Sequence, residues 1–339
     1  KKGERMKKLD ILNKKINKRK VGKYIKSPIN YTGNKFRILE QMIPHMPEKI
    51  DVMIDLFSGG ATVGLNIDAN KIIFVDSNPK VINLLKYIAS YSDVDLLFEE
   101  IFDLVEDYGF SLSSIYGYSM YKSDAKESNP NNGLKYYNEK AFLKLREDYN
   151  KLSNKNSDEG NLMLYILMVY GFNNDMRFSS VGNFNLPTGK TDFNLNNALK
   201  LKQFIDRTNN IDYEFICDTF NSERVQKLIY SSDFVYMDPP YLITRAVYNE
   251  SNKWTNLEEK ELLKLIDNLL LQNKNFMLSN VMKKGDTYNE PLYYWSLDKS
   301  SEISIIDIDY HYRGASYNKK DRNGKEQEVI IVPKLPSQT

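Results

Sequence analysis

The sequence predicts an α/β fold built on a mostly parallel sheet, and the distribution of its apolar residues supports this in two ways. Short apolar runs with the length of buried strands end before Phe57 and lie at 71–76, 213–218, 234–237 and 275–279. Apolar residues at helical spacing mark helices between them, most clearly at 81–88 and 257–271. Two last apolar segments, around 303–308 and 328–332, flank a polar loop, which indicates an antiparallel hairpin at the end of the sheet.

The composition favours a folded protein without metal chemistry. The 339 residues are 41% apolar and 12% aromatic, enough for two domains or for one domain with a large insertion. Cys217 is the single cysteine and there are two histidines, so we expect no disulfide framework, no metal site and no histidine catalysis. We find no apolar stretch of 18 residues and no signal peptide, and we therefore expect a cytoplasmic protein that does not enter a membrane.

The charge is concentrated at one end of the chain. Residues 1–26 carry twelve Lys and Arg against two acids, which leaves 35 basic against 43 acidic residues elsewhere. Such a basic arm could contact phosphates, and it could equally be a solvated, partly helical tail.

The segment Phe234–Tyr241 is the one most suggestive of chemistry. The predicted buried strand ends just before Asp238, which begins a loop that Pro239 and Pro240 make stiff. Tyr241 follows in the same loop. A carboxylate and a proline carbonyl both accept hydrogen bonds, an exocyclic amine donates two, and an aromatic ring can stack on a base. The alternative is a turn with a helix-capping Asp, which is the more common role of such a tripeptide taken alone.

A glycine turn after the first strand indicates a nucleoside site. The strand that starts at Val52 runs through Asp55 into Phe57-Ser58-Gly59-Gly60 and then a helix, so that backbone can approach a ligand closely. The spacing does not match G-x-G-x-x-G, which argues against a nicotinamide-dependent oxidoreductase. Asp76 ends the next strand, where such sites hold ribose hydroxyls, although an isolated Asp there would more often cap a helix.

Two polar stretches could contact ligands. The turn Ser27–Lys35 precedes residues at helical spacing, and backbone amides at a helix start beside Lys35 can bind an anion. Residues 171–189 are rich in aromatic and amide side chains around Arg177, and we expect a hairpin or long loop that contacts a partner. Arg and Asn are side chains that read guanine and adenine edges.

Together these residues resemble the Dam-like, alpha-group N6-adenine DNA methyltransferases, over roughly residues 27–333. Asn30–Lys35, Asp55–Gly60 and Asp238–Tyr241 are similar to the family's first cofactor turn, its Phe-x-Gly-Gly loop and its catalytic motif. Residues 172–177 and 182–189 are similar to its Asn-Gly-x-x-Arg and Gly-x-Phe-Asn-x-Pro-x-Gly segment, with Asn174 in place of the glycine. Asp175 stands where GATC-methylating relatives carry an apolar residue, so the resemblance does not predict a GATC target.

The resemblance implies a Rossmann-like methyltransferase sheet with a mainly helical target-recognition insertion. The implied domains are an arm at 1–26, a catalytic domain at 27–92 and 196–339, and a target-recognition domain at 93–195. The implied catalytic residues are Asp238, Pro239, Pro240 and Tyr241. Those implied to bind S-adenosylmethionine are Asn30, Tyr31, Gly33, Lys35, Asp55, Phe57, Ser58, Gly59, Gly60, Asp76, Asp218 and Asp238. Those implied to contact DNA are Asn173, Asn174, Asp175, Arg177, Asn185 and Pro187.

The activity that the resemblance implies is methylation of a flipped-out adenine in double-stranded DNA. Asp76 would hold the ribose hydroxyls, Asp218 the adenine amine of the cofactor, and Lys35 its carboxylate. Rival expectations are amino-methylation of cytosine, RNA or glutamine, and a nucleic-acid-binding module without catalysis. A bacterial or phage-encoded monomer with a cognate restriction endonuclease is the expected context.

Overall fold

The computed structural model describes residues 2–121, 132–243, 254–308 and 326–334, and the chain divides into two compact units. Unit 1 comprises Lys1–Gly33 and Pro79–Ile211, and unit 2 comprises Asn34–Asn78 and Asp212–Thr339. Over the described ranges, no helix combines the length and the apolar character needed to cross a bilayer.

Unit 2 is built on one mixed sheet of eight strands in the order β3-β2-β1-β4-β5-β8-β7, with β6 paired to β5. Neighbours from β3 to β5 run parallel, and β8 is antiparallel to both β5 and β7. The predicted parallel sheet with an antiparallel hairpin is therefore confirmed, while the polar loop of that hairpin lies outside the described residues. The strands are β1 (Val52–Leu56), β2 (Lys71–Asp76), β3 (Asp212–Cys217), β4 (Phe234–Met237), β5 (Asn275–Lys284), β6 (Thr287–Tyr288), β7 (Ile303–Asp307) and β8 (Glu326–Pro333).

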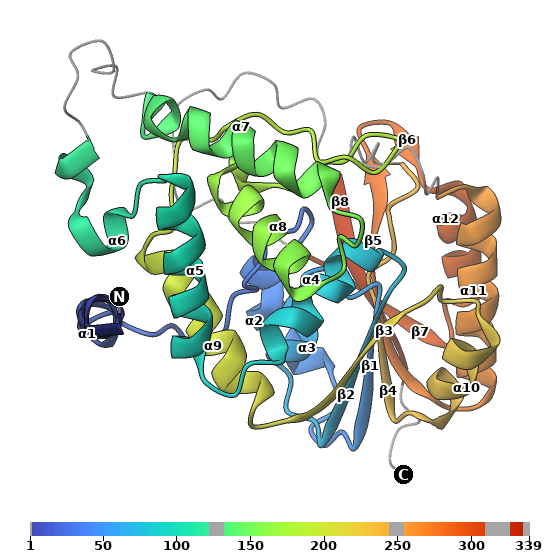
Figure 1. The fold of residues 1–339 in the computed structure, drawn as a ribbon. Coiled ribbons are helices and arrows are strands. Elements are labelled where there is room, and N and C mark those ends of the chain that lie inside the picture. The colour runs from blue at the N-terminus through green and yellow to red at the C-terminus, as the bar shows by residue number, and fades with distance from the viewer. Residues whose placement is uncertain (1, 122–131, 244–253, 309–325, 335–339) are drawn as a thin grey trace. The chain divides into compact units, whose positions relative to one another are not determined.

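Three helices cover one face of this sheet (Figure 1). Alternate strand residues, among them Ile54, Ile73 and Val235, pack with apolar residues of α10, α11 and α12 in one buried cluster. The opposite strand residues, such as Met53 and Phe74, are buried too, which explains why the strands have continuous apolar sequences. The helices of unit 2 are α10 (Glu223–Ser231), α11 (Asn256–Leu271), α12 (Glu290–Asp298), the short α2 (Leu39–Met42) and α3 (Thr62–Leu65), and the 3₁₀ turns η1 (Phe36–Ile38) and η2 (Ile43–His45).

Unit 1 is helical over its described part and is centred on α8 (Figure 1). Every residue of α8 from Gly160 to Tyr170 is buried, so this helix is apolar on all sides, and α4, α5 and α7 contact it. Its α-helices are α1 (Lys2–Asn17), α4 (Pro79–Ala89), α5 (Val94–Tyr108), α6 (Ser113–Tyr116), α7 (Lys135–Lys151), α8 (Asp158–Tyr170) and α9 (Leu195–Thr208), with 3₁₀ turns η3 (Tyr118–Tyr121) and η5 (Phe172–Asn174).

The basic arm is helical over most of its length, as the partly helical alternative predicted, but α1 is packed against other helices and is not a solvated tail. Leu12 and Ile16 are buried, and α1 contacts α5, α6 and α9 of the same unit. Arg5 forms an ion pair with Asp103 of α5, and Lys8 forms one with Glu106. Lys15 donates to the backbone carbonyls of Ser114 and Ile115 in α6, whereas Lys7, Lys14 and Lys18 are exposed.

Candidate active site

The carboxyl edge of the parallel strands brings predicted site residues of unit 2 together. Asp76 is the last residue of β2, Asp218 follows β3 and Asp238 follows β4, while the glycine turn follows β1. Backbone bonds tie these ends together, since Asp218 N donates to Asp76 O at 3.1 Å and Asp238 N donates to Leu56 O at 3.3 Å. In open α/β sheets this edge, on either side of the point where strand order reverses, is where ligands bind.

The glycine turn is held in a tight, strained conformation. Phe57 and Ala61 have φ of 63° and 65°, in the left-handed region that side chains rarely adopt. Gly64 of α3 lies against β1 and β2 so closely that a Cβ there would fall 2.4 Å from the Phe74 ring. Asp55, 1% exposed, accepts a hydrogen bond from Gly64 N at 2.9 Å and so joins the strand to the helix. Burial, reinforced by the nearby Asp238 and Asp76, raises the pKa of Asp55 well above its ordinary value.

Asp76 organises the same turn from the next strand. Its Oδ2 accepts from Gly59 N and its Oδ1 from Asn78 N, both at 2.9 Å. Burial raises the pKa of Asp76, and the two backbone hydrogen bonds oppose that rise. The adjacent Ser58 Oγ is one of four buried side-chain oxygens in the described residues that have no hydrogen-bond partner. A turn that combines the fixed carboxylate of Asp76 with the unpartnered hydroxyl of Ser58 can accommodate a polar ligand such as a ribose.

The Asp238 carboxylate lies in a compact charged cluster. Lys35 Nζ is 2.8 Å from Asp238 Oδ2 and 3.7 Å from Glu328 Oε1. The Tyr241 hydroxyl donates to Asp238 Oδ1 at 2.9 Å and to Glu328 Oε1 at 3.2 Å. Lys35 Nζ also lies 5.2 Å from the centre of the Tyr241 ring. Burial, followed by the charges of Asp238 and Glu328, raises the pKa of Tyr241, so its hydroxyl stays protonated.

Three aromatic rings lie beside this edge, and two of them were not predicted. Phe57, Phe220 and Trp254 contact one another with ring centres 5.4 to 5.6 Å apart. Asp218, predicted for the same region, is held by the backbone N–H of Thr219 and the hydroxyl of Ser222, each at 2.8 Å. An apolar wall next to a fixed carboxylate has the chemistry of an adenine pocket.

A buried glutamate anchors the tryptophan of this wall. Glu259, 1% exposed, accepts from Trp254 Nε1 at 2.5 Å through Oε2. Its Oε1 accepts from Asn280 Nδ2 at 3.1 Å and from Asn289 Nδ2 at 2.6 Å, and both asparagines are fully buried. The one signal in the sequence that could have revealed this network is an acid at an inward position of an amphipathic helix.

In unit 1, residues 171–189 form a short hairpin, one of the two forms expected. Isolated bridges pair Gly171 with Thr188 and Phe178 with Phe184. Arg177 is exposed, and its Nε donates to Asn185 Oδ1 at 2.8 Å while its Nη2 donates to Asn185 O at 3.2 Å. Pro187 is exposed as well, because alternation along the strand turns Phe184 and Leu186 inward.

Asn173 and Asn174 lie in η5, near the base of the hairpin, and both have left-handed backbone, with φ of 57° and 53°. Asn174 therefore occupies a conformation that the glycine of the resembling motif would adopt without strain, and asparagine tolerates it better than most residues. Its side chain donates to Val169 O and to Thr191 Oγ1, and Asp175 Oδ1 accepts from Met176 N. Of the predicted first turn, Asn30 donates to Asn173 O at 3.1 Å. Tyr31 and Gly33 also belong to unit 1, whereas Lys35 belongs to unit 2.

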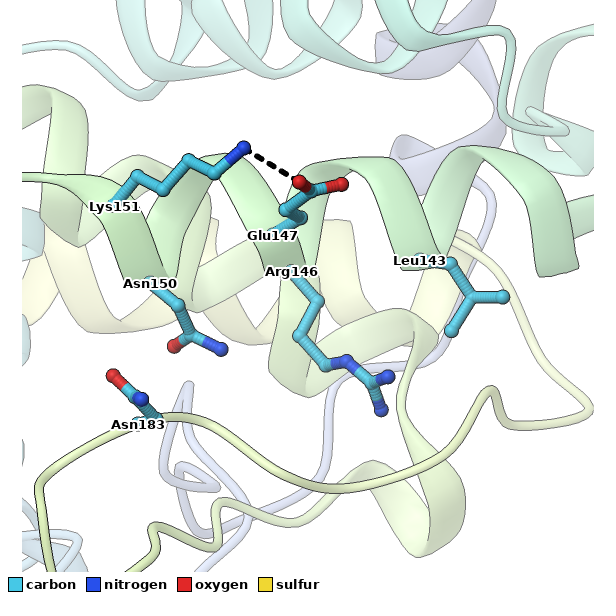
Figure 2. A pocket seen from close by; sticks show the side chains of 6 residues that line it. All are labelled: Leu143, Arg146, Glu147, Asn150, Lys151 and Asn183. Carbon is cyan, nitrogen blue, oxygen red and sulfur yellow. Dashed lines mark hydrogen bonds and ion pairs between the residues drawn. The ribbon is translucent and has the colours of Figure 1, made fainter.

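A groove of about 590 Å³ separates α7 from this hairpin (Figure 2). Asn150 spans it, accepting from Phe184 N at 2.8 Å and donating to Phe184 O at 3.0 Å. Arg146 donates to Leu186 O at 2.9 Å. Side chains of α7 thus hold the strand that carries Asn185, which in turn orients Arg177.

A mostly parallel sheet whose carboxyl edge bears a glycine turn and acidic strand ends is typical of α/β proteins with a nucleoside-type ligand site. Residues 31–313 match the D12 class N6 adenine-specific DNA methyltransferases, and the chain belongs to this family.

The chain is also similar to named methylases. It is 36% identical over 328 residues to the type II methyltransferase M.FokI of Planomicrobium okeanokoites, covering 94% of this chain and 45% of that protein. It is 33% identical over 330 residues to the modification methylase StsI of Streptococcus sanguinis, with 95% and 45% covered. It is 25% identical over 258 residues to the DNA adenine methylase of Salmonella typhi, with 74% and 79% covered. The chain therefore spans less than half the length of the first two relatives.

Proposed function

We propose that this chain transfers a methyl group from S-adenosylmethionine to the N6 amine of a flipped-out adenine in double-stranded DNA, within a restriction-modification system. The observation that carries the proposal is the position of Asp238, at the end of β4 with Tyr241 bonded to it and the glycine turn beside it. Family membership and the names of the two longer relatives support the same reaction.

The residues at the strand edge fit the cofactor. Asp76 and the Gly59 turn suit the ribose, and Ser58 Oγ supplies a buried polar atom that a ligand can satisfy. The ring wall of Phe57, Phe220 and Trp254 suits the adenine, and Asp218, held by Thr219 and Ser222, is proposed to accept from its amine. When bound, S-adenosylmethionine supplies the electrophilic methyl group.

The chain's own residues then position the nucleophile. An adenine amine is a weak nucleophile because its lone pair is conjugated into the ring. The Asp238 carboxylate and the Pro239 carbonyl accept hydrogen bonds from the two amine hydrogens, which fixes the direction of attack and stabilises positive charge on the nitrogen. Tyr241 stacks on the extruded base.

On the DNA side, Arg177 is proposed to read a guanine, supported by its exposure and by the fixed geometry that Asn185 gives it. Asn173, Asn174, Asp175 and Pro187 are proposed contacts on the same hairpin. The outward lysines of α1 and the basic residues of 119–202 are proposed phosphate contacts, which makes binding weaker as salt concentration rises.

The first test is incubation of the chain with tritiated S-adenosylmethionine and unmethylated duplex DNA, followed by nucleoside analysis and methylation-sensitive sequencing. We expect label in N6-methyladenine at one short motif. Asp238→Ala should abolish transfer while cofactor affinity measured by calorimetry is retained, and the exposed Asp298→Ala is the matched control. Label in cytosine would replace adenine as the proposed target, transfer to RNA but not to DNA in a parallel incubation would replace the proposed substrate, and DNA binding without transfer would favour a binding module.

A second test addresses the cofactor residues. Asp76→Ala should weaken S-adenosylmethionine binding about 10- to 100-fold, the value of a lost charge-assisted hydrogen bond. Unchanged affinity would remove Asp76 from the site. A cytoplasmic location, a monomeric state and a cognate endonuclease remain predictions that co-purification and sedimentation can check.

A further inference from the structure

Both oxygens of the proposed catalytic carboxylate are already in use. Asp238 Oδ2 is paired with Lys35 Nζ at 2.8 Å, and Asp238 Oδ1 accepts from the Tyr241 hydroxyl at 2.9 Å. The proposed function, on which this inference rests, requires the same carboxylate to accept a hydrogen from the target amine. Each carboxylate oxygen can accept more than one hydrogen bond, but the ammonium of Lys35 at 2.8 Å neutralises much of the charge on Oδ2, so a strong bond to the amine is favoured when one of the two present donors moves away.

Both donors need an acceptor when they leave Asp238. The Lys35 side chain is 3% exposed, and an ammonium group buried without a carboxylate partner is strongly unfavourable. The Tyr241 hydroxyl lies between the carboxylates of Asp238 and Glu328 and is within hydrogen-bond distance of both, so Glu328 can still accept from it when Asp238 does not. Exchange at Asp238 thus calls for a second acceptor within reach of both groups.

Glu328 meets this requirement. Its Oε1 is 3.2 Å from the Tyr241 hydroxyl and 3.7 Å from Lys35 Nζ, so a shift of about an ångström brings it into full contact with the ammonium group. Its side chain is 9% exposed, and it projects from β8, whose neighbour β5 pairs with β4. We propose that Glu328 is a positioning residue that takes over Lys35, and keeps the Tyr241 hydroxyl, while Asp238 accepts the target amine.

The proposal distinguishes two roles among the carboxylates of the cluster. Asp238 contacts the reacting amine, whereas Glu328 contacts only Lys35 and Tyr241 and undergoes no covalent change. Without the charge of Glu328, Lys35 stays on Asp238 and competes with adenine. The defect should therefore lie in base capture and methyl transfer and not in cofactor binding.

The test compares Glu328→Gln with Glu326→Gln, a control on the same strand whose ion pair with Lys284 is half exposed. Single-turnover methylation, calorimetric cofactor affinity, and the fluorescence of 2-aminopurine placed at the target adenine are measured. We expect E328Q to lower the transfer rate about 10- to 100-fold and to reduce the 2-aminopurine signal, since one charge-assisted contact is lost. Cofactor affinity should stay within about twofold, and Glu328→Asp should recover part of the rate.

Removing the competing ammonium provides the decisive comparison. If Glu328 acts through Lys35, the E328Q change should cost little in a Lys35→Met background, so K35M and the double variant should transfer at similar rates. Wild-type transfer by E328Q, or equal losses with and without Lys35, would overturn the role of Glu328. Where E328Q alone is unstable, a loss of transfer on adding E328Q to K35M would still overturn the role of Glu328. Absence of transfer by the wild-type chain would count instead against the proposed function.

Discussion

The Glu259 network allows a graded prediction for the stability of unit 2. Glu259→Gln keeps an oxygen that can accept from Asn280 and Asn289 but places an amide N–H₂ against the Trp254 N–H. The loss of one charge-assisted bond should lower the free energy of unfolding by about 1.5–3 kcal/mol. Glu259→Ala leaves all three donors without an acceptor, two of them on fully buried side chains, and should cost about 4–6 kcal/mol.

Tryptophan fluorescence gives a local readout of this change. The chain has two tryptophans, Trp254 and Trp295, and both belong to unit 2. In a Trp295→Phe background, denaturant titration followed at Trp254 reports the unfolding of this unit alone. In E259Q the emission should also shift to longer wavelength, because the indole loses its anchor and its contacts with Phe57 and Phe220 loosen.

The control is Glu261→Gln, an exposed acid on the same helix, which should change stability by less than about 0.5 kcal/mol. Equal stability of E259Q and E261Q would show that the Trp254 bond contributes nothing net. If E259A were no less stable than E259Q, the two asparagine bonds would carry no energy either.

Three further comparisons test strain and burial. Because burial raises the pKa of Asp55 above its ordinary 3.8, the folded state holds that proton more tightly, so ionisation costs stability. The melting temperature of Asp55→Asn, measured relative to that of the wild type, should therefore increase as pH rises from about 4 to 7. A difference in melting temperature that stays constant over this pH range would refute the prediction. Asn174→Ala should be about 1 kcal/mol less stable than Asn174→Gly in thermal unfolding, because only alanine carries a Cβ at φ 53°, and equal stability would contradict the strain. Tyr165→Phe should raise the free energy of unfolding by about 1 kcal/mol in urea titration, since the Tyr165 hydroxyl is buried without a partner in the described part of the chain. A loss of stability would indicate an acceptor.

The sheet could be predicted because each strand is a local apolar run whose ends are marked by Asp, Gly or Pro. That is why the ends at Asp76 and Asp238, and the final antiparallel pair, lie where the sequence places them. The helices of residues 94–108 and 195–208 were not predicted, since their charged outer faces interrupt the apolar pattern. The packing of α1 was left open for the same reason, because only Leu12 and Ile16 mark its inner face.

The charged cluster of Lys35, Asp238, Tyr241 and Glu328 could not be predicted from local sequence patterns. Lys35 was expected to face an anionic ligand, yet in this structure it is paired with Asp238, about 200 residues away in the sequence. From the sequence, Glu328 could be interpreted only as the start of a strand. Its position in the charged cluster depends on β8 lying beside β5 and on the face of the sheet that Glu328 occupies. Long-range register of this kind is set by the whole sheet, and no spacing within one segment encodes it.

The excess of acid at this edge has a consequence for turnover. Asp238 and Glu328 flank the ammonium group of Lys35, and Asp76 adds a carboxyl group at the glycine turn of the same strand edge, so these three acids outnumber the one cation paired with them and favour a negative local potential. S-adenosylmethionine carries a positive sulfonium centre, whereas the thioether left after methyl transfer is neutral. In the proposed reaction this field favours the charged cofactor over its spent product, so that loss of charge at sulfur itself promotes product release and limits product inhibition.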